Sequence, residues 1–148
     1  AQKRTQAEQL YRYCNTHPKL NGIDYAKAEA LSIMCIKNIS NINLDTIKKH
    51  KEECQKLAKK TGIGKHYFLA WYGLIEKYIS LELFSFAINE CQDMLKEATS
   101  SNFGEGMAYS YHAYGKILHI QRAEAKSNKY FMQAISLYEK VYKKISMK

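Results

Sequence analysis

The chain has 148 residues, with one proline and seven glycines, and 46% of its residues are hydrophobic. This composition excludes an intrinsically disordered chain and fits one globular domain or a short stack of repeats. The longest apolar runs, such as the one at 68–75, are too short to span a bilayer, so we expect no membrane insertion.

The formal charge of +9 favours acidic partners such as nucleic acid, anionic lipid or an acidic peptide. Most lysines stand at helical spacing among glutamates, however, so a solvated helix face is the favoured explanation of them. The four cysteines form no CxxC pair, and no zinc or redox motif results. We expect no cofactor, and we expect buried free thiols at Cys14, Cys35, Cys54 and Cys91.

Apolar residues at helical spacing predict seven helices and no sheet. In chain order these segments are about 3–14, 24–38, 44–60, 65–80, 83–98, 108–121 and 124–145. The turn at 40–43 supplies N-cap candidates for the third helix, and Gly62 and Gly64 supply C-cap glycines at its end. Asn102 and Glu105 stand three residues apart, which predicts a capping box before the sixth helix.

Three similar turns, "LNGIDY", "KTGIGKHY" and "SNFGEGMAY", recur about every 41 residues. Each follows one helix and opens another, so we expect three helical hairpins. Their superposition aligns a large residue followed by a small one: Leu31 with Ser32, Tyr72 with Gly73, and Tyr114 with Gly115. A small side chain here lets the paired helix approach closely, so packing accounts for Gly115.

The third hairpin resembles the tetratricopeptide repeats. The residues that match the large-large-Gly-large pattern of the first repeat helix are Tyr111, Tyr114, Gly115 and Leu118. Phe131 and Ala134 match the second repeat helix, whereas Ser127 stands where the family prefers alanine. The second hairpin matches through Leu69, Tyr72, Gly73 and Ala87, with about two residues inserted between its helices. The first hairpin is degenerate, and the resemblance covers about residues 23–146.

The resemblance implies an all-α fold, a right-handed α-solenoid of antiparallel helical hairpins with about seven helices. We expect a single domain of this kind over residues 1–148, as a piece of a larger protein. Its parts are an N-terminal padding helix at 1–16, a degenerate hairpin at 23–61, and two further hairpins at 64–99 and 104–146.

Four residues remain on one face of the sixth helix after its core positions are assigned: Tyr109, His112, Lys116 and His119. In proteins that this pattern resembles, the corresponding face lines a concave groove that grips a peptide or a partner helix. The same superposition selects Tyr67, Ala70, Leu74 and Lys77 in the second hairpin, and Glu29, Ile33 and Lys37 in the first. Lysines and tyrosines suit an acidic or carboxylate-ending peptide. The alternative is that this face packs against the chain's own terminal helix.

Metal binding and catalysis are not expected. His112 and His119 are seven residues apart, so their rings lie about 10 Å apart along a helix, too far for one zinc ion. The chain also contains no nucleophile elbow, zinc-protease motif, phosphate-binding loop or dinucleotide-binding turn.

Nucleic acid is the rival partner, because lysines are frequent in the third helix and in the tail. They are Lys48, Lys49, Lys51, Lys56, Lys59, Lys60, Lys140, Lys143, Lys144 and Lys148. Asp45, Glu52 and Glu53 interrupt the first group, and no aromatic stacking platform accompanies it.

We therefore expect a non-catalytic module that binds a protein or peptide. A short repeat array that ends in a basic helix resembles the sensory regions of bacterial sensor histidine kinases and related transcriptional regulators, an analogy at the level of the fold. It implies an extracytoplasmic sensor region in two-component signal transduction, with a cytoplasmic regulator as the alternative. Self-association to a homo-oligomer is a further alternative.

Overall fold

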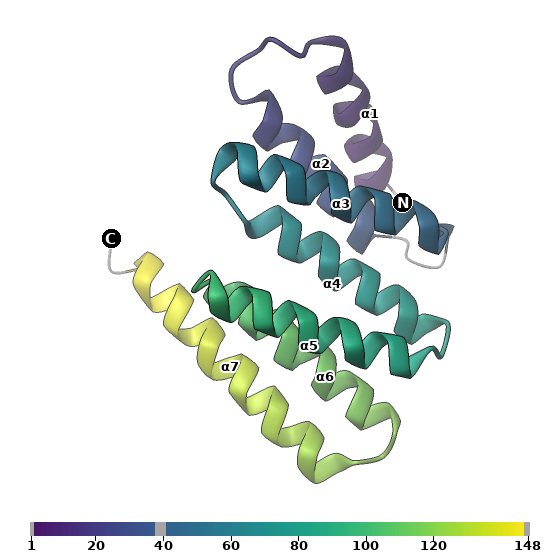
Figure 1. Cartoon of the computed structure of the whole chain (residues 1–148), viewed down its shortest axis with the longest axis vertical. Coiled ribbons are helices and arrows are strands. Elements are labelled where there is room, and N and C mark those ends of the chain that lie inside the picture. The colour runs from purple at the N-terminus through teal and green to yellow at the C-terminus, as the bar shows by residue number, and fades with distance from the viewer. Residues whose placement is uncertain (1, 38–40, 147–148) are drawn as a thin grey trace. The chain divides into compact units, whose positions relative to one another are not determined.

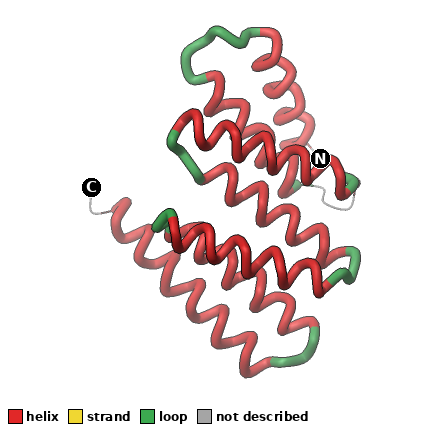
Figure 2. The backbone as a smooth tube through the Cα atoms, viewed as in Figure 1, coloured by secondary structure: helices red, strands yellow, loops and turns green. Residues whose placement is uncertain are grey.

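The computed structural model describes residues 2–37 and 41–146. Over these residues the chain forms seven α-helices and no strand, which confirms the all-α prediction (Figures 1 and 2). The helices are α1 (Gln2–Thr16), α2 (Ile23–Ile36), α3 (Leu44–Thr61), α4 (Lys65–Ser80), α5 (Phe84–Ser100), α6 (Gly104–Ile120) and α7 (Glu124–Ser146). Asn38, where the second helix was expected to end, and Lys148 lie outside the described residues, as does the side chain of Lys144.

The helices belong to two compact units. Unit 1 (Ala1–Ser80) contains α1 to α4, and unit 2 (Leu81–Lys148) contains α5 to α7. The boundary falls within the hairpin predicted at 64–99. A single domain over 1–148 therefore stays a prediction.

Helix α3 begins and ends where its local chemistry predicts. The side chain of Asn43 accepts a hydrogen bond from the backbone N–H of Thr46 at 2.8 Å, so it caps an otherwise unpaired donor. At the other end Gly62 adopts a left-handed φ of 73° and donates to the carbonyl of Ala58. The Asn43 N-cap and the Gly62 C-cap are confirmed, whereas Gly64 lies at the start of α4, where its carbonyl accepts from the backbone N–H of Phe68 at 3.2 Å.

The predicted capping box at α6 is wrong. Phe103 occupies the N-cap position without a side-chain hydrogen bond, and Glu105 instead accepts from the hydroxyl of Tyr109. Asn102 instead lies in the turn that ends the preceding helix, α5. It has a φ of 54°, and this conformation lets Phe103 N–H donate to the carbonyl of Ala98 at 2.8 Å, as in a Schellman turn.

Helix α2 is the centre of unit 1, where it packs against α1, α3 and α4. Fully buried side chains of this unit include Leu31, Cys35, Ile47 and Cys54, so the expected burial of these two thiols is confirmed. A Cβ placed on Gly73 would lie 2.5 Å from the carbonyl oxygen of Cys35. The absence of a side chain at Gly73 therefore lets α4 approach the backbone of α2.

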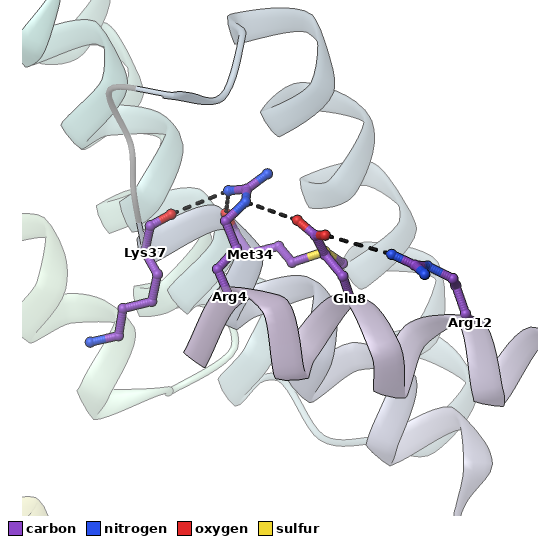
Figure 3. Close-up of polar contacts among 5 residues, drawn as sticks. All are labelled: Arg4, Glu8, Arg12, Met34 and Lys37. Carbon is purple, nitrogen blue, oxygen red and sulfur yellow. Dashed lines mark hydrogen bonds and ion pairs between the residues drawn. The ribbon is translucent and has the colours of Figure 1, made fainter. Parts of the chain in front are cut away.

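Arg4 fastens α1 to the end of α2 (Figure 3). One guanidinium nitrogen donates to the carbonyls of Met34, at 2.9 Å, and Lys37, at 3.2 Å. Its Nε also forms an ion pair with Glu8 at 3.1 Å, and Arg12 forms a second, longer ion pair with Glu8 at 3.8 Å. A cation at the carboxyl end of α2 satisfies terminal carbonyls and opposes the negative end of the helix dipole.

A second polar contact joins α1 to α3. The hydroxyl of Tyr11 lies 2.8 and 3.0 Å from the two carboxylate oxygens of Glu53. Lys27 of α2 lies 3.4 Å from the same carboxylate and 5.4 Å from the centre of the Tyr11 ring. The arrangement raises the pKa of Tyr11, chiefly through burial and then through the bond to Glu53, so its hydroxyl remains a donor.

In unit 2, α6 packs against both α5 and α7 (Figure 1). A Cβ on Gly104, at the start of α6, would lie 3.2 Å from Val141 in the later part of α7. Near the other end of the pair, Ser127 Oγ of α7 donates to the carbonyl of Gly115 at 2.8 Å. Ser127 is fully buried, so this bond satisfies the hydroxyl that replaces the alanine expected at this position.

Candidate functional site

The residues predicted to line a groove are distributed over both units. Tyr67, Ala70 and Lys77 lie on α4 of unit 1, together with the related position Leu74. The ring of Tyr67 lies 5.1 Å from that of Phe68 and 5.4 Å from that of Trp71. Tyr109, His112, Lys116 and His119 lie on α6 of unit 2.

Two of the four predicted α6 residues contact α7 through their rings. The ring of Tyr109 lies 6.1 Å from that of Tyr138, and its hydroxyl donates to Glu105 at 3.1 Å. His112 makes edge contacts with Phe131 at 6.0 Å and with Tyr138 at 6.4 Å. This part of the predicted face is thus engaged with the chain's own terminal helix, the arrangement that we expected as the alternative to ligand binding.

The surroundings of Tyr109 and Tyr138 keep both phenols neutral. Burial, and then the charge of Glu105, raises the pKa of Tyr109 well above its ordinary value. Burial also raises the pKa of Tyr138, to about 12. Neither hydroxyl is therefore an acid or a base near neutral pH.

The other two α6 residues differ in exposure. Lys116 is half-buried, whereas His119 is exposed, with its Nδ1 3.1 Å from the carboxylate of Glu124. Binding of a partner by these four residues stays a prediction.

The neighbouring face of α6, which we expected to be core, divides into two parts. Gly115 and Leu118 are buried, and a Cβ on Gly115 would lie 2.7 Å from the Phe131 ring, which confirms that packing accounts for this glycine. Tyr111 and Tyr114 are only half-buried. Their rings lie 6.0 and 4.7 Å from the ring of Tyr130 on α7.

Tyr111 lines two hollows on unit 2. The larger, of about 620 Å³, is lined by Tyr111, Ala125, Asn128, Lys129, Met132, Gln133, Ser136 and Leu137. The smaller, of about 130 Å³, is lined by Cys91, Gln92, Leu95, Ser110, Tyr111, Tyr114 and Tyr130. We call these two hollows together the tyrosine groove. All three helices of unit 2 contribute to it.

The groove follows one face of α7. Its lining residues from Ala125 to Leu137 recur every three or four positions, so they form a continuous strip over about three helical turns. The strip combines three apolar side chains, Ala125, Met132 and Leu137, with two amides, a hydroxyl and the ammonium group of Lys129. Met132 is 70% exposed, which leaves its thioether available for contact.

Sequence reasoning missed this groove because it assigned Tyr111 and Tyr114 to the core. A signal was nevertheless present. Three tyrosines at or next to supposed core positions, Tyr111, Tyr114 and Tyr130, each need a hydrogen-bond partner for the hydroxyl if they are buried. A position at the edge of a groove meets that need with solvent.

The lysines of α3 are partly engaged within unit 1. Lys51 Nζ lies 3.9 Å from the centre of the Trp71 ring and Lys48 Nζ 5.8 Å from that of Tyr78. Lys60 pairs with Asp24 at 3.3 Å. These contacts give three of the lysines roles within the fold, and the nucleic-acid alternative stays a prediction.

Within the described ranges, no three His, Cys, Asp or Glu side chains stand close enough to hold a metal ion. None of the described helices has the length and apolar character needed to cross a membrane. No family model, curated protein or solved structure matches the chain.

Proposed function

We propose that the chain is a non-catalytic helical repeat module that binds a protein or peptide, with the tyrosine groove of unit 2 as its binding site. The observation that carries the proposal is the placement of Tyr111, which is half-buried and lines both hollows, the larger of which follows about three turns of α7. Tyrosine is enriched in protein-binding surfaces because it offers a large rigid area and one hydroxyl.

Packing of α6 on α7 supports a repeat similar to the tetratricopeptide repeats. Gly115 meets Phe131, and Ser127 bonds to the Gly115 carbonyl, as expected of an antiparallel hairpin with these matching positions. A right-handed solenoid over the whole chain is part of the same proposal. So is its place in the sensory region of a signal-transduction protein.

The lining of the groove suits a peptide better than a small polar metabolite. Its lining combines apolar side chains with side-chain amides, and amides both donate to and accept from a peptide backbone. The larger hollow is open and elongated along α7, whereas sites for small molecules enclose most of the ligand surface.

The proposal can be tested by panning a random peptide library against the purified chain. Peptides that bind the wild type should bind Met132→Ala less tightly, because the Met132 side chain lines the groove. Ile135→Ala is the matched control: Ile135 lies on the same helix at 63% exposure but does not line the groove. Equal loss of binding in both variants, or no enriched peptide, would contradict the proposed site.

A further inference from the structure

We propose that the ligand of the tyrosine groove is a polyproline II segment flanked by carboxylates. This inference rests on the proposed function and specifies its ligand. It is drawn from three properties of the groove: the kinds of side chain in its walls, its length along α7, and the position of its positive charges.

The walls present rings and hydrogen-bond donors. Tyr111, Tyr114 and Tyr130 lie together at the smaller hollow, and Gln92, Asn128 and Gln133 add side-chain amides along the two hollows. A polyproline II segment has no internal hydrogen bonds and leaves its carbonyls free to accept. The phenol O–H and amide N–H groups supply the donors, and aromatic-lined grooves are the usual receptors for such segments.

The length of the groove sets the length of the segment. From Ala125 to Leu137 the strip on α7 extends about 18 Å at roughly 1.5 Å per residue. Polyproline II rises about 3.1 Å per residue, so about six residues cover this strip. The segment is already extended before it binds, and therefore loses little conformational entropy on binding.

One lysine lines the groove and a second lies just beyond it on α7. Lys129 belongs to its lining, and Lys140 follows on the same face of α7, about one turn beyond Ser136 and Leu137. Both are exposed, and neither forms an ion pair with a described carboxylate. The lining of both hollows contains no Asp or Glu. Glu139, the acidic residue beside Lys140, is paired with Lys143 at 3.1 Å.

Charge complementarity follows from this arrangement. Lys129 and Lys140 are eleven positions apart, about 16 Å along the helix, which is close to the reach of the six-residue segment. A ligand with acidic residues on both sides of its prolines would place carboxylates near these ammonium groups. The net charge of +9 adds a favourable field for the same ligand.

The experiment compares three synthetic peptides of equal length by fluorescence anisotropy. The first has six prolines between two glutamates at each end, the second replaces the prolines with alternating glycine and serine, and the third replaces the glutamates with lysines. We expect the first to bind roughly tenfold more tightly than either of the others. Lys129→Glu with Lys140→Glu should reverse the preference between the first and third peptides.

Two results would overturn the inference. If the glycine-serine peptide binds as tightly as the first peptide, charge and not the polyproline II conformation determines binding. If the lysine-flanked peptide binds as tightly as the first, the two lysines do not select for carboxylates. The sequences of the peptides enriched by panning distinguish this inference from the proposed function. Enriched peptides that depend on Met132 but carry neither proline nor acidic residues would overturn only the ligand class. Circular dichroism of the double variant confirms that it is folded.

Discussion

Gly115 of α6 lies directly against Phe131 of α7, so close that a Cβ at Gly115 would stand 2.7 Å from two atoms of the ring. Ser127, one turn before Phe131, donates to the carbonyl of the same glycine. These contacts fix the approach of the two helices that form most of the tyrosine groove.

Replacing Gly115 with leucine should therefore destabilise unit 2. The added side chain forces Phe131 out of its position, and overpacking of this kind lowers the free energy of unfolding by about 1–3 kcal/mol. Urea denaturation followed by circular dichroism measures the change. Ala125→Leu, at an exposed position of α7, is the control for the added bulk. Wild-type stability of the Gly115 variant would show that the close approach is absent.

The turn between α6 and α7 allows a stabilising substitution. Arg122 has a φ of 63°, a left-handed conformation that costs most residues about 1 kcal/mol and glycine almost nothing. We expect Arg122→Gly to raise the free energy of unfolding by about 0.5 kcal/mol. Gln121→Gly, at a φ of −79°, should lower it. A thermal denaturation series distinguishes the two, and destabilisation by both glycines would contradict the turn geometry.

Tyr11→Phe should weaken the attachment of α1. The change removes the hydroxyl that bonds to both oxygens of Glu53, and a hydrogen bond to a charged partner contributes about 1.5–3 kcal/mol, less where solvent reaches it. Hydrogen exchange of α1 amides reports the loss locally. Tyr13→Phe, at an exposed tyrosine of the same helix, should leave exchange unchanged. Equal exchange in both variants would mean that the Tyr11 hydroxyl does not hold the helix.

Stability should fall at alkaline pH. The pKa values of Tyr109 and Tyr138 are raised above 10.0 in the folded chain, so the unfolded chain loses these protons first as the pH rises. Their contribution is complete below about pH 10 and is lost progressively above it, toward pH 12 for Tyr138. Urea midpoints between pH 8 and pH 12 measure the slope. Tyr138→Phe should reduce this slope relative to the wild type, and an unchanged slope would contradict the assignment.

Local features of the fold were predictable from the sequence because they depend on neighbouring residues. The helix spacing, the Asn43 cap and the Gly62 terminus all follow from residues within one turn of one another. The predicted capping box at Asn102 was wrong because this residue lies between two helix ends. It adopts the left-handed conformation that ends α5 and does not cap α6.

The site was less predictable because the exposure of a side chain depends on how closely the neighbouring helices pack, which the pattern within one helix does not give. Tyr111 and Tyr114 occupy positions that match a repeat core, yet both are half-buried and line the smaller hollow. His112 was expected to face a partner, and it contacts Phe131 and Tyr138. Helical periodicity assigns residues to faces, but it does not say how completely a neighbouring helix covers each face.

The tyrosine groove is tested most directly by NMR of the tyrosine rings during titration with a peptide enriched from the library. Binding in the groove predicts chemical-shift changes for Tyr111, Tyr114 and Tyr130, with smaller or no changes for Tyr109 and Tyr138. Changes confined to Tyr109 and Tyr138, with the three groove rings unaffected, would contradict the proposed site and place the ligand on the other face of α6.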